Sequence, residues 1–246
     1  MNAGRVPRLP ERRHRDKVGT VNDDQPQLDA PVRGPRPAGL GFRAGLWTRF
    51  IRRILRIIAG LKIVRVRVVN RGVVPSSGPV ILASNHISML DGVFLWGALR
   101  RRAQAIAMAE LWKWPIVGFL VTKGDFIPVR RGDTDSGNDA LGRMENALRH
   151  NGAVIIYPEG RVVPPGESVR FKPGAAVLAM RTRTPIIPVR IVGSNELLPL
   201  KKFRKGKSFD RSKQITLYFG TPLDPENYAT PGDLLRDLRW SIYSLG

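Results

Sequence analysis

From residue 63 onward, short runs of consecutive apolar residues alternate with stretches whose apolar positions recur every three or four residues. The runs predict strands at 63–69, 80–83, 105–109, 126–129, 153–157, 186–192 and 215–219. The periodic stretches predict helices at 88–99, 138–149, 175–181 and 233–244. Continuous apolar strands separated by helices are typical of a sheet covered on both faces. We therefore expect one layered α/β domain, with a central mostly parallel or mixed sheet flanked by helices.

Upstream of these elements, residues 44–61 show a helical pattern with two unlike faces. Trp47, Phe50, Ile54 and Ile58 fall on one face, and a set of arginines occupies the other. A basic amphipathic helix with an aromatic residue is typical of a helix that lies in the plane of a membrane surface. The alternative is that the apolar face packs on the core of the domain.

Residues 1–43 are rich in proline and charge and contain few large apolar side chains. Such a segment buries too little apolar surface to offset its loss of conformational entropy. We expect a disordered Pro/Arg-rich tail at 1–43 and a folded domain at 44–246. The start of the chain shows no apolar segment typical of a secretory signal, and no uncharged apolar run is long enough to predict a spanning helix.

Composition narrows the chemistry. The chain has 246 residues, no cysteine, three histidines and a formal net charge of +21. The length fits one domain plus a tail. Without cysteine there is no disulfide, thiolate nucleophile or Cys-based zinc site, and so few histidines make a His-only metal site unexpected. The positive charge calls for an anionic partner, such as nucleic acid, an acidic lipid surface or a phosphorylated substrate.

His86 and Asp91 are the strongest candidates for catalysis. They belong to the sequence Asn-His-x4-Asp, which directly follows a predicted strand. Histidine is the usual proton acceptor near neutral pH, and a nearby carboxylate can orient the ring. Five residues of ideal α-helix turn the chain by about 500°, leaving the two side chains roughly 140° apart. We therefore expect His86 in the loop, with the helix beginning near Ser88 and Asp91 in its first turn.

The same residues have a purely structural interpretation. Ser88 and Asp91 have the spacing of a capping box, in which the carboxylate serves only the start of the helix. His86 would then be a histidine that is hydrogen-bonded within the core. The segment alone leaves both interpretations open.

Three further motifs contain groups suited to anions. Arg130 and Arg131 end a predicted strand and could bind phosphate, or could simply be solvated. The sequence Tyr-Pro-Glu-Gly-Arg at 157–161 brings a carboxylate and a glycine to the end of an apolar strand, although Pro-Glu-Gly is also a common turn. Lys172 precedes a helix start made of small residues, where an anion can bind.

Taken together, in this order and at these separations, the motifs resemble the glycerolipid acyltransferase family, that is, the 1-acylglycerol-3-phosphate (lysophosphatidic acid) acyltransferases and their relatives. The resemblance covers roughly residues 60–225. It implies a membrane-associated O-acyltransferase that moves a fatty acyl group from an acyl thioester to the hydroxyl of a lysophosphatidate-type acceptor, giving phosphatidic acid. The donor would be acyl-CoA or acyl carrier protein, acting as co-substrate, with no metal and no cofactor.

The resemblance also implies roles for individual residues. His86 would be the general base, and Asp91 would orient its ring and stabilise its charge. The acceptor would be held by a group of substrate-binding residues, namely Arg130, Arg131, Glu159, Gly160, Arg161 and Lys172.

Two positions depart from the pattern of the family. Val162 stands where the family commonly has arginine, and Met108 stands where it often has lysine. Both positions are associated with phosphate binding in the family. Either one of Arg130, Arg131, Arg161 and Lys172 takes over the phosphate binding of the missing arginine and lysine, or the acceptor is glycerol 3-phosphate or a polar lipid without phosphate.

The substrate implies a peripheral location on the cytoplasmic side of a membrane, with an anionic membrane surface as partner. Candidate docking elements are the helix at 44–61 and the basic stretch at 201–207, for which a solvated loop is the alternative. In a different class, the charge could belong to a nucleic-acid-binding protein. No helix-turn-helix, zinc-finger or RNP-type sequence supports that alternative, so no specific nucleic acid is expected.

Overall fold

A computed structural model describes residues 53, 64–124, 126–130, 132–164, 166–197 and 213–246. The predicted tail at 1–43, the basic stretch at 201–207 and nearly all of the predicted helix at 44–61 lie outside these residues. Of that helix only Arg53 is described, as an exposed helical residue. Among the described residues no helix combines the length and hydropathy needed to cross a membrane.

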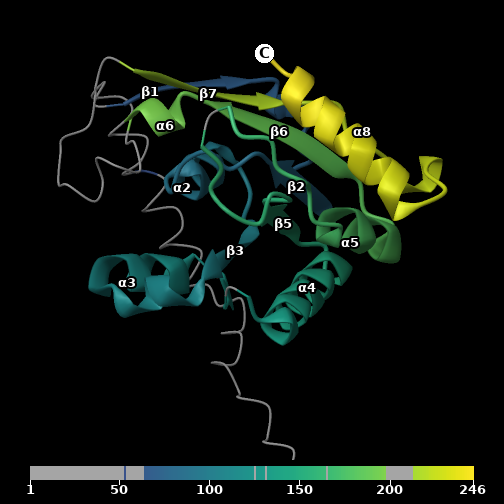
Figure 1. Cartoon of the computed structure of the whole chain (residues 1–246), viewed down its shortest axis with the longest axis horizontal. Coiled ribbons are helices and arrows are strands. Elements are labelled where there is room, and N and C mark those ends of the chain that lie inside the picture. The colour runs from purple at the N-terminus through teal and green to yellow at the C-terminus, as the bar shows by residue number, and fades with distance from the viewer. Residues whose placement is uncertain (1–52, 54–63, 125, 131, 165, 198–212) are drawn as a thin grey trace, which may run out of the picture. The chain divides into compact units, whose positions relative to one another are not determined.

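The described chain forms a central sheet flanked by helices (Figure 1). The strands are β1 (Arg65–Val69), β2 (Val80–Ser84), β3 (Gln104–Met108), β4 (Ile127–Val129), β5 (Ala153–Ile156), β6 (Ile186–Val192) and β7 (Gln214–Phe219). The α-helices are α2 (Asp91–Ala98), α3 (Pro115–Lys123), α4 (Thr134–Arg149), α5 (Gly174–Thr182), α6 (Ser194–Leu197) and α8 (Pro231–Ser244). The predicted α/β fold with a mixed sheet is therefore confirmed.

The sheet has seven strands in the order β1-β7-β6-β2-β5-β3-β4. The strands from β6 to β4 run parallel to one another, so their carboxyl ends share one edge of the sheet. β7 is antiparallel to β6, and β1 is parallel to β7. The amino end of β1, at Arg65, therefore lies at the edge where β2 and β5 end.

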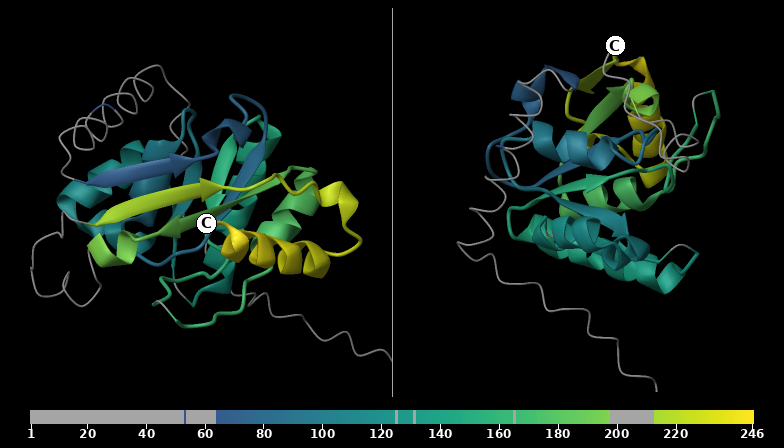
Figure 2. Two further views of the ribbon diagram at one scale, coloured as in Figure 1. Left: turned by 90° about the horizontal axis from the view of Figure 1, so that it is seen from above. Right: turned by 90° about the vertical axis from the view of Figure 1, so that its left-hand side faces the viewer.

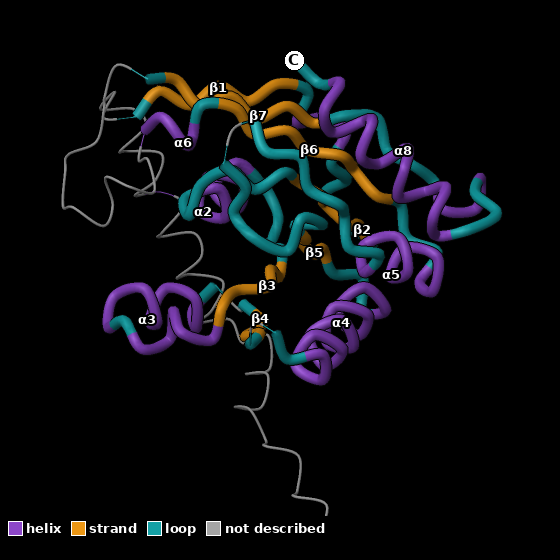
Figure 3. Tube along the Cα trace, viewed as in Figure 1, coloured by secondary structure: helices purple, strands orange, loops and turns teal. Residues whose placement is uncertain are grey.

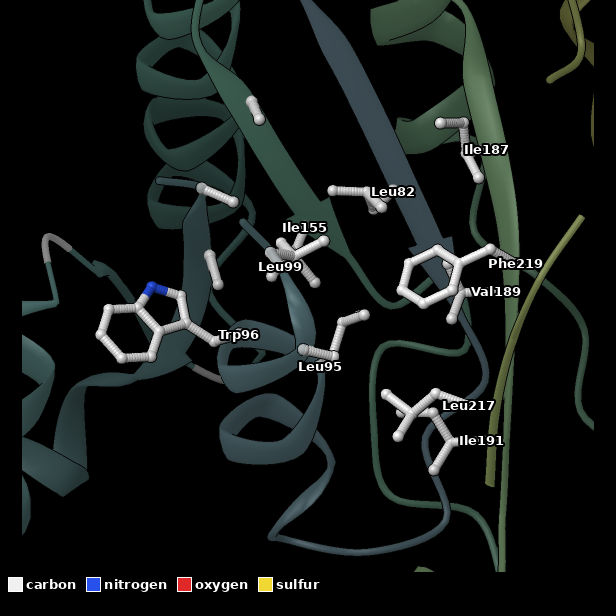
Figure 4. Close-up of a cluster of buried hydrophobic side chains, with 14 of the residues drawn as sticks. Leu82, Leu95, Trp96, Leu99, Ile155, Ile187, Val189, Ile191, Leu217 and Phe219 are labelled. Carbon is white, nitrogen blue, oxygen red and sulfur yellow. The ribbon is translucent and has the colours of Figure 1, made fainter. Parts of the chain in front are cut away.

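Helices cover both faces of the sheet, which explains why its central strands are continuously apolar. Every residue of β2 and β5 is buried. On one face Leu95 and Trp96 of α2 pack with Leu82 and Ile155 (Figure 4). On the other face α4, α5 and α8 pack over Ile81, Ala83, Val154 and Ile156, and the views from above and from the side show these layers (Figure 2).

Local sequence signals fix the ends of the two most amphipathic helices. Asp133 caps α4 by accepting a hydrogen bond from the Ser136 amide at 2.9 Å. Thr230 caps α8 in the same way, and Pro231 occupies the first helical position, where its missing N–H is no loss. In α8 the buried residues Leu234, Leu238 and Ile242 recur every four positions. This spacing places one stripe against the sheet and leaves the opposite face of α8 in solvent.

Three details differ from the sequence predictions. Helix α2 begins at Asp91 and not near Ser88, because the Asp91 carboxylate already binds the amides of residues 87 and 88 in the loop. Helix α4 begins at Thr134, four residues earlier than expected, because of the Asp133 cap. Helices α3 and α6 were not predicted; the tube trace shows α3 between β3 and β4 (Figure 3).

Candidate active site

The loops after β2 and β5 lie side by side at the carboxyl edge of the sheet. The two strands are parallel neighbours, with Ala83 paired with Ile156. Three residues beyond this pair the chain reaches His86 on one strand and Glu159 on the other. The register of the sheet therefore brings two motifs together that lie some seventy residues apart in the sequence.

His86 and Asp91 meet as the sequence predicted. Nδ1 of His86 lies 3.0 Å from Oδ2 of Asp91. That carboxylate is fully buried, whereas the His86 side chain is 19% exposed. Since a carboxylate only accepts hydrogen bonds, we assign the ring proton to Nδ1. This tautomer leaves Nε2 with a free lone pair that can take up a proton.

Asp91 is held by a full set of hydrogen bonds. Its Oδ2 also accepts bonds from the amides of Ile87 and Ser88, at 2.7 and 2.8 Å. Its Oδ1 accepts a bond from Oγ of Ser194 at 2.5 Å. The carboxylate thus serves the helix start and the histidine together, so the capping and catalytic interpretations are compatible. These donors compensate for the loss of hydration at a buried charge.

Tyr157 fixes the orientation of the His86 ring. The two rings stack with their centroids 4.2 Å apart and their planes 23° from parallel. Burial, with a smaller contribution from the Asp91 charge, raises the pKa of the Tyr157 hydroxyl well above its usual value. The hydroxyl therefore stays neutral. It has no hydrogen-bond partner among the described residues.

Glu159 supports the backbone of the histidine loop. Its Oε2 accepts a hydrogen bond from the His86 amide at 2.9 Å, and its Oε1 accepts one from the Tyr243 hydroxyl at 2.7 Å. In return the His86 carbonyl accepts a bond from the Val163 amide at 2.7 Å. The loop that carries the histidine is therefore held on both sides by the loop that follows β5.

Burial raises the pKa of the Glu159 carboxyl, while the bonds from Tyr243 and the His86 amide lower it. We expect Tyr243→Phe to lower the free energy of unfolding by about 1–3 kcal/mol at neutral pH, because a buried carboxylate loses one of two donors. The pKa of Glu159 in the folded state then rises further above the unfolded value, so the folded state binds a proton over a wider pH range. The added destabilisation should therefore be largest above the folded-state pKa of Glu159 in the variant, and it should fade as pH falls below the folded-state pKa of Glu159 in the wild type.

Urea unfolding of both proteins at a series of pH values between about 4 and 8 measures this difference. Tyr218→Phe is the matched control, because the Tyr218 hydroxyl has no carboxylate partner among the residues with defined positions. A loss of stability in Tyr243→Phe that is the same at every pH would contradict the assignment.

Two further residues of the site were not identified from the sequence. The Asn85 side chain donates to the Ile191 carbonyl at 2.9 Å and accepts from the Ile191 amide at 2.7 Å, so it continues the ladder between β2 and β6 after β2 has ended. Ser194 follows Gly193, whose φ of +84° permits the turn that directs its hydroxyl to Asp91. The position of Asn85 directly before His86 was a signal that could have identified it, whereas no local signal marked Ser194.

The predicted substrate-binding residues lie at varied positions around the dyad. Gly160 has φ +69°, and a Cβ there would lie 2.7 Å from Cε of Lys172, so the lysine side chain packs over the glycine. Arg161 is exposed and forms an ion pair with Glu167. Arg130 is exposed at the end of β4. Arg131 lies outside the described residues.

Glu159, Gly160 and Lys172 are therefore close to His86, and Arg130 is farther away. β4 is separated from β2 by β5 and β3. Three strand spacings correspond to about 14 Å, a distance that an extended ligand could bridge. Both oxygens of Glu159 already bind protein donors, so its part in the site is to hold the histidine loop; direct contact between Glu159 and an acceptor stays a prediction.

The assembled group can perform proton transfer. It offers a partly exposed imidazole with a free Nε2, a buried carboxylate behind it, and cationic side chains near the same edge of the sheet. Such a pair can take a proton from an attacking hydroxyl and return it to a leaving group. Among the described residues no cluster of side chains has the composition of a metal site.

Comparisons with known proteins agree with this arrangement. A family model described as Acyltransferase matches residues 65–192. The chain is 29% identical over 126 residues to a chloroplastic 1-acyl-sn-glycerol-3-phosphate acyltransferase of Brassica napus, covering 51% of this chain and 36% of the relative. It is 27% identical over 186 residues to a probable 1-acyl-sn-glycerol-3-phosphate acyltransferase of Mycoplasma pneumoniae, covering 72% of this chain and 68% of the relative.

A solved structure has the same fold. The crystal structure of the 1-acyl-sn-glycerophosphate (LPA) acyltransferase PlsC from Thermotoga maritima superposes with a TM-score of 0.64 and 22% sequence identity. The similarity covers 81% of this chain and 78% of that chain. By contrast, the chain spans only about a third of the length of the chloroplast relative, since 36% of that protein is matched.

Proposed function

The chain belongs to the acyltransferase family, and on this premise we propose that it transfers a fatty acyl group from an acyl thioester to the hydroxyl of a lysophosphatidate-type acceptor, giving phosphatidic acid. The observation that carries the proposal is the hydrogen bond between His86 and the buried Asp91, with Nε2 of His86 left free. The reaction class is that of the similar proteins, which are 1-acyl-sn-glycerol-3-phosphate acyltransferases.

The dyad accounts for each proton in this reaction. Nε2 of His86 takes the proton from the acceptor hydroxyl as its oxygen attacks the thioester carbonyl carbon. A C–O bond forms, and the carbonyl π electrons move onto oxygen to give a tetrahedral oxyanion. When the carbonyl re-forms, the C–S bond breaks and the imidazolium returns the proton to the thiolate. Asp91 stabilises the imidazolium while it exists, and such base assistance typically contributes about 10²–10⁴-fold.

The acceptor phosphate has two candidate partners among the described residues. Met108 stands where the family often has lysine. Its register partner on the neighbouring strand β4 is Val129, and Arg130 follows Val129 directly, so an arginine lies one residue beyond this pair. Lys172 packs over Gly160, beside the loop that holds His86. We propose that Arg130 and Lys172 bind the phosphate and that the predicted compensation for Met108 and Val162 comes from them.

A second candidate acceptor follows from Arg161. This arginine, one position before the place where the family has its own, is already paired with Glu167. If the pair persists in the complex, the site has fewer free guanidinium groups for phosphate, which favours a polar lipid without phosphate. The reaction at His86 would be the same.

We also propose that the protein acts as a peripheral protein at the cytoplasmic face of an anionic membrane. The support is the net charge of +21 together with an acceptor that resides in the bilayer. The two candidate docking stretches, 44–61 and 201–207, are the segments whose deletion would test this location by vesicle flotation.

An acceptor panel tests the proposed reaction. Lysophosphatidate, a lysolipid without free phosphate and a glycolipid are presented in vesicles, glycerol 3-phosphate is added in solution, and products are identified by mass spectrometry. We expect phosphatidic acid from lysophosphatidate and about a tenfold rise in KM for that acceptor in Arg130→Ala, since one charge-assisted bond to phosphate is lost. Arg181→Ala, an exposed arginine near the end of α5, is the control and should leave KM unchanged.

Preferential acylation of a non-phosphate acceptor, with Arg130→Ala having no effect, would favour the second candidate. Absence of acyl transfer to any acceptor in the panel, with both acyl-CoA and acyl carrier protein donors, would overturn the proposal.

A further inference from the structure

An open groove of about 610 Å³ runs along the solvent face of α8, against the chain that leads into α5. Its lining combines cationic and aromatic side chains, namely Arg170, Phe171, Arg236, Arg239, Trp240 and Tyr243. Of the motifs identified in the sequence only the one around Lys172 reaches this groove, through Phe171, and the matched family region ends at residue 192, before α8 begins.

The most distinctive residue of the groove is Trp240, which is 73% exposed. A large aromatic ring left in water beside cations is a common feature of binding sites for planar or charged ligands. Arg170 is exposed and makes no hydrogen bond or ion pair with any residue whose position the structure defines. The groove thus offers an aromatic face and an uncompensated guanidinium group near each other.

The other two arginines are only partly occupied. Arg239 donates one hydrogen bond to Oγ of Ser168 at 2.9 Å, which leaves further N–H donors of its guanidinium group. Arg236 pairs with Asp233 at 3.1 Å and Asp237 at 3.7 Å, and these are the acidic side chains of α8. Arg170 and Arg239 are therefore the cations available to an anionic ligand.

The groove is connected to the candidate active site through Tyr243. This residue lines the groove, and its hydroxyl binds Glu159, which in turn binds the amide of His86. From Tyr243 the groove extends along α8 to Gly232, a helical span of roughly 17 Å. One end thus lies beside the residues that support the dyad, and the other end lies well away from them.

We propose that this groove binds the 3′-phosphorylated adenosine diphosphate of a coenzyme A thioester, with the adenine on Trp240 and the phosphates on Arg170 and Arg239. The pantetheine arm then leads the acyl group past Tyr243 toward His86. The assignment rests on the proposed acyl transfer and specifies its donor. It uses both properties of the groove, because guanidinium groups bind phosphate and an indole stacks on a base.

Two other anionic partners fit less well. An acidic carrier protein or an anionic bilayer supplies carboxylates or phosphates but no aromatic base to stack on Trp240. Either would also meet the groove as a broad surface and leave its hollow unfilled. A nucleotide is small enough to enter it.

The test is direct titration calorimetry with coenzyme A, 3′-dephospho-coenzyme A and pantetheine. We expect Kd for coenzyme A to rise at least tenfold in Arg170→Ala and in Trp240→Ala, since each removes one contact to the nucleotide. Both side chains are exposed, so the substitutions should leave the fold intact, as circular dichroism would check. Arg149→Ala, which removes an exposed arginine of α4 outside the groove, is the matched control and should bind coenzyme A as wild type does.

Three results are informative. Weaker binding of coenzyme A in both variants, with 3′-dephospho-coenzyme A bound more weakly than coenzyme A by wild type, supports the site. Unchanged coenzyme A affinity in both variants overturns it. Unchanged affinity combined with loss of vesicle flotation or of turnover with an acyl carrier protein donor also overturns it and assigns the groove to that partner.

Binding and turnover are separate measurements, so the coenzyme A groove and the acyl-transfer reaction can be rejected independently of each other. Coenzyme A binding that depends on Arg170, in a protein without acyl transfer, would retain the groove and reject the reaction. Acyl transfer by a protein whose coenzyme A affinity is unchanged by both substitutions would retain the reaction and reject the groove as the coenzyme A site.

Discussion

Replacement of His86 by alanine is expected to lower kcat for acyl transfer by about 10²–10⁴-fold, because we propose Nε2 as the proton acceptor for the attacking hydroxyl. The fold should survive this change. Asp91 keeps its bonds from the amides of Ile87 and Ser88 and from Ser194. What the protein loses is the hydrogen bond from His86 to Asp91 and the stacking of His86 on Tyr157, a contact that contributes about 1 kcal/mol.

Steady-state acyl transfer and urea unfolding of the same preparation measure both effects. His150→Ala is the matched control, because His150 is an exposed histidine at the end of α4. That variant should retain the kcat of the wild type. A His86→Ala protein that is folded and turns over like wild type would remove the basis of the catalytic assignment.

The second large effect is expected for Asp91→Asn, with kcat reduced at least a hundredfold. The amide keeps the size of the carboxylate but not its charge, so the imidazolium formed during the reaction is no longer stabilised. An asparagine oxygen can still accept the bonds from the amides of Ile87 and Ser88, while its NH₂ group faces Ser194. We therefore expect a modest loss of stability, about 1–3 kcal/mol.

Comparison with Asp91→Ala separates the structural role of this carboxylate in the loop from its role beside His86. It leaves two loop amides and the Ser194 hydroxyl without their acceptor in a fully buried position, which should cost about 3–5 kcal/mol. Chemical denaturation should rank the proteins as wild type, then Asn, then Ala, whereas both variants should lose activity. If the asparagine variant kept wild-type kcat, Asp91 would serve the helix start alone.

The parts of the fold that the sequence predicted are those with a distinctive local pattern. β2 and β5 were found because both of their faces are covered, so every residue is apolar. Helix α4 was found because its apolar residues recur at helical spacing. Helix α3 was missed because the segment Pro115–Lys123 is apolar on nearly all sides and shows no periodicity to distinguish a helix from a strand.

The orientation of the edge strands could not be predicted, because the burial patterns of β1 and β7 reflect how far their faces are covered and not the direction of the neighbouring strand. β7 turns back along β6, and β1 follows β7. This arrangement depends on packing across the whole sheet and has no signal within either strand.

The site likewise contains contacts that the local sequence predicted and contacts that it did not. His86 and Asp91 were found because they are five residues apart and their meeting depends on one turn of chain. The contacts Glu159 to Tyr243 and Asp91 to Ser194 span 84 and 103 residues and depend on the order of the strands. A sequence motif can thus name the reacting groups, while the residues that hold them in place become visible only with the tertiary structure.

The reversed direction of β1 has a consequence for how the reaction would depend on substrate. Because Arg65 begins that strand at the edge where His86 lies, the chain enters the sheet at the same edge as the dyad, with β7 and β6 between β1 and β2. If the preceding segment anchors the protein as proposed, encounter with a lysolipid becomes a search in two dimensions. Velocity would then follow the mole fraction of acceptor within the lipid plane, and diluting that plane with inert lipid would slow turnover even at constant bulk concentration.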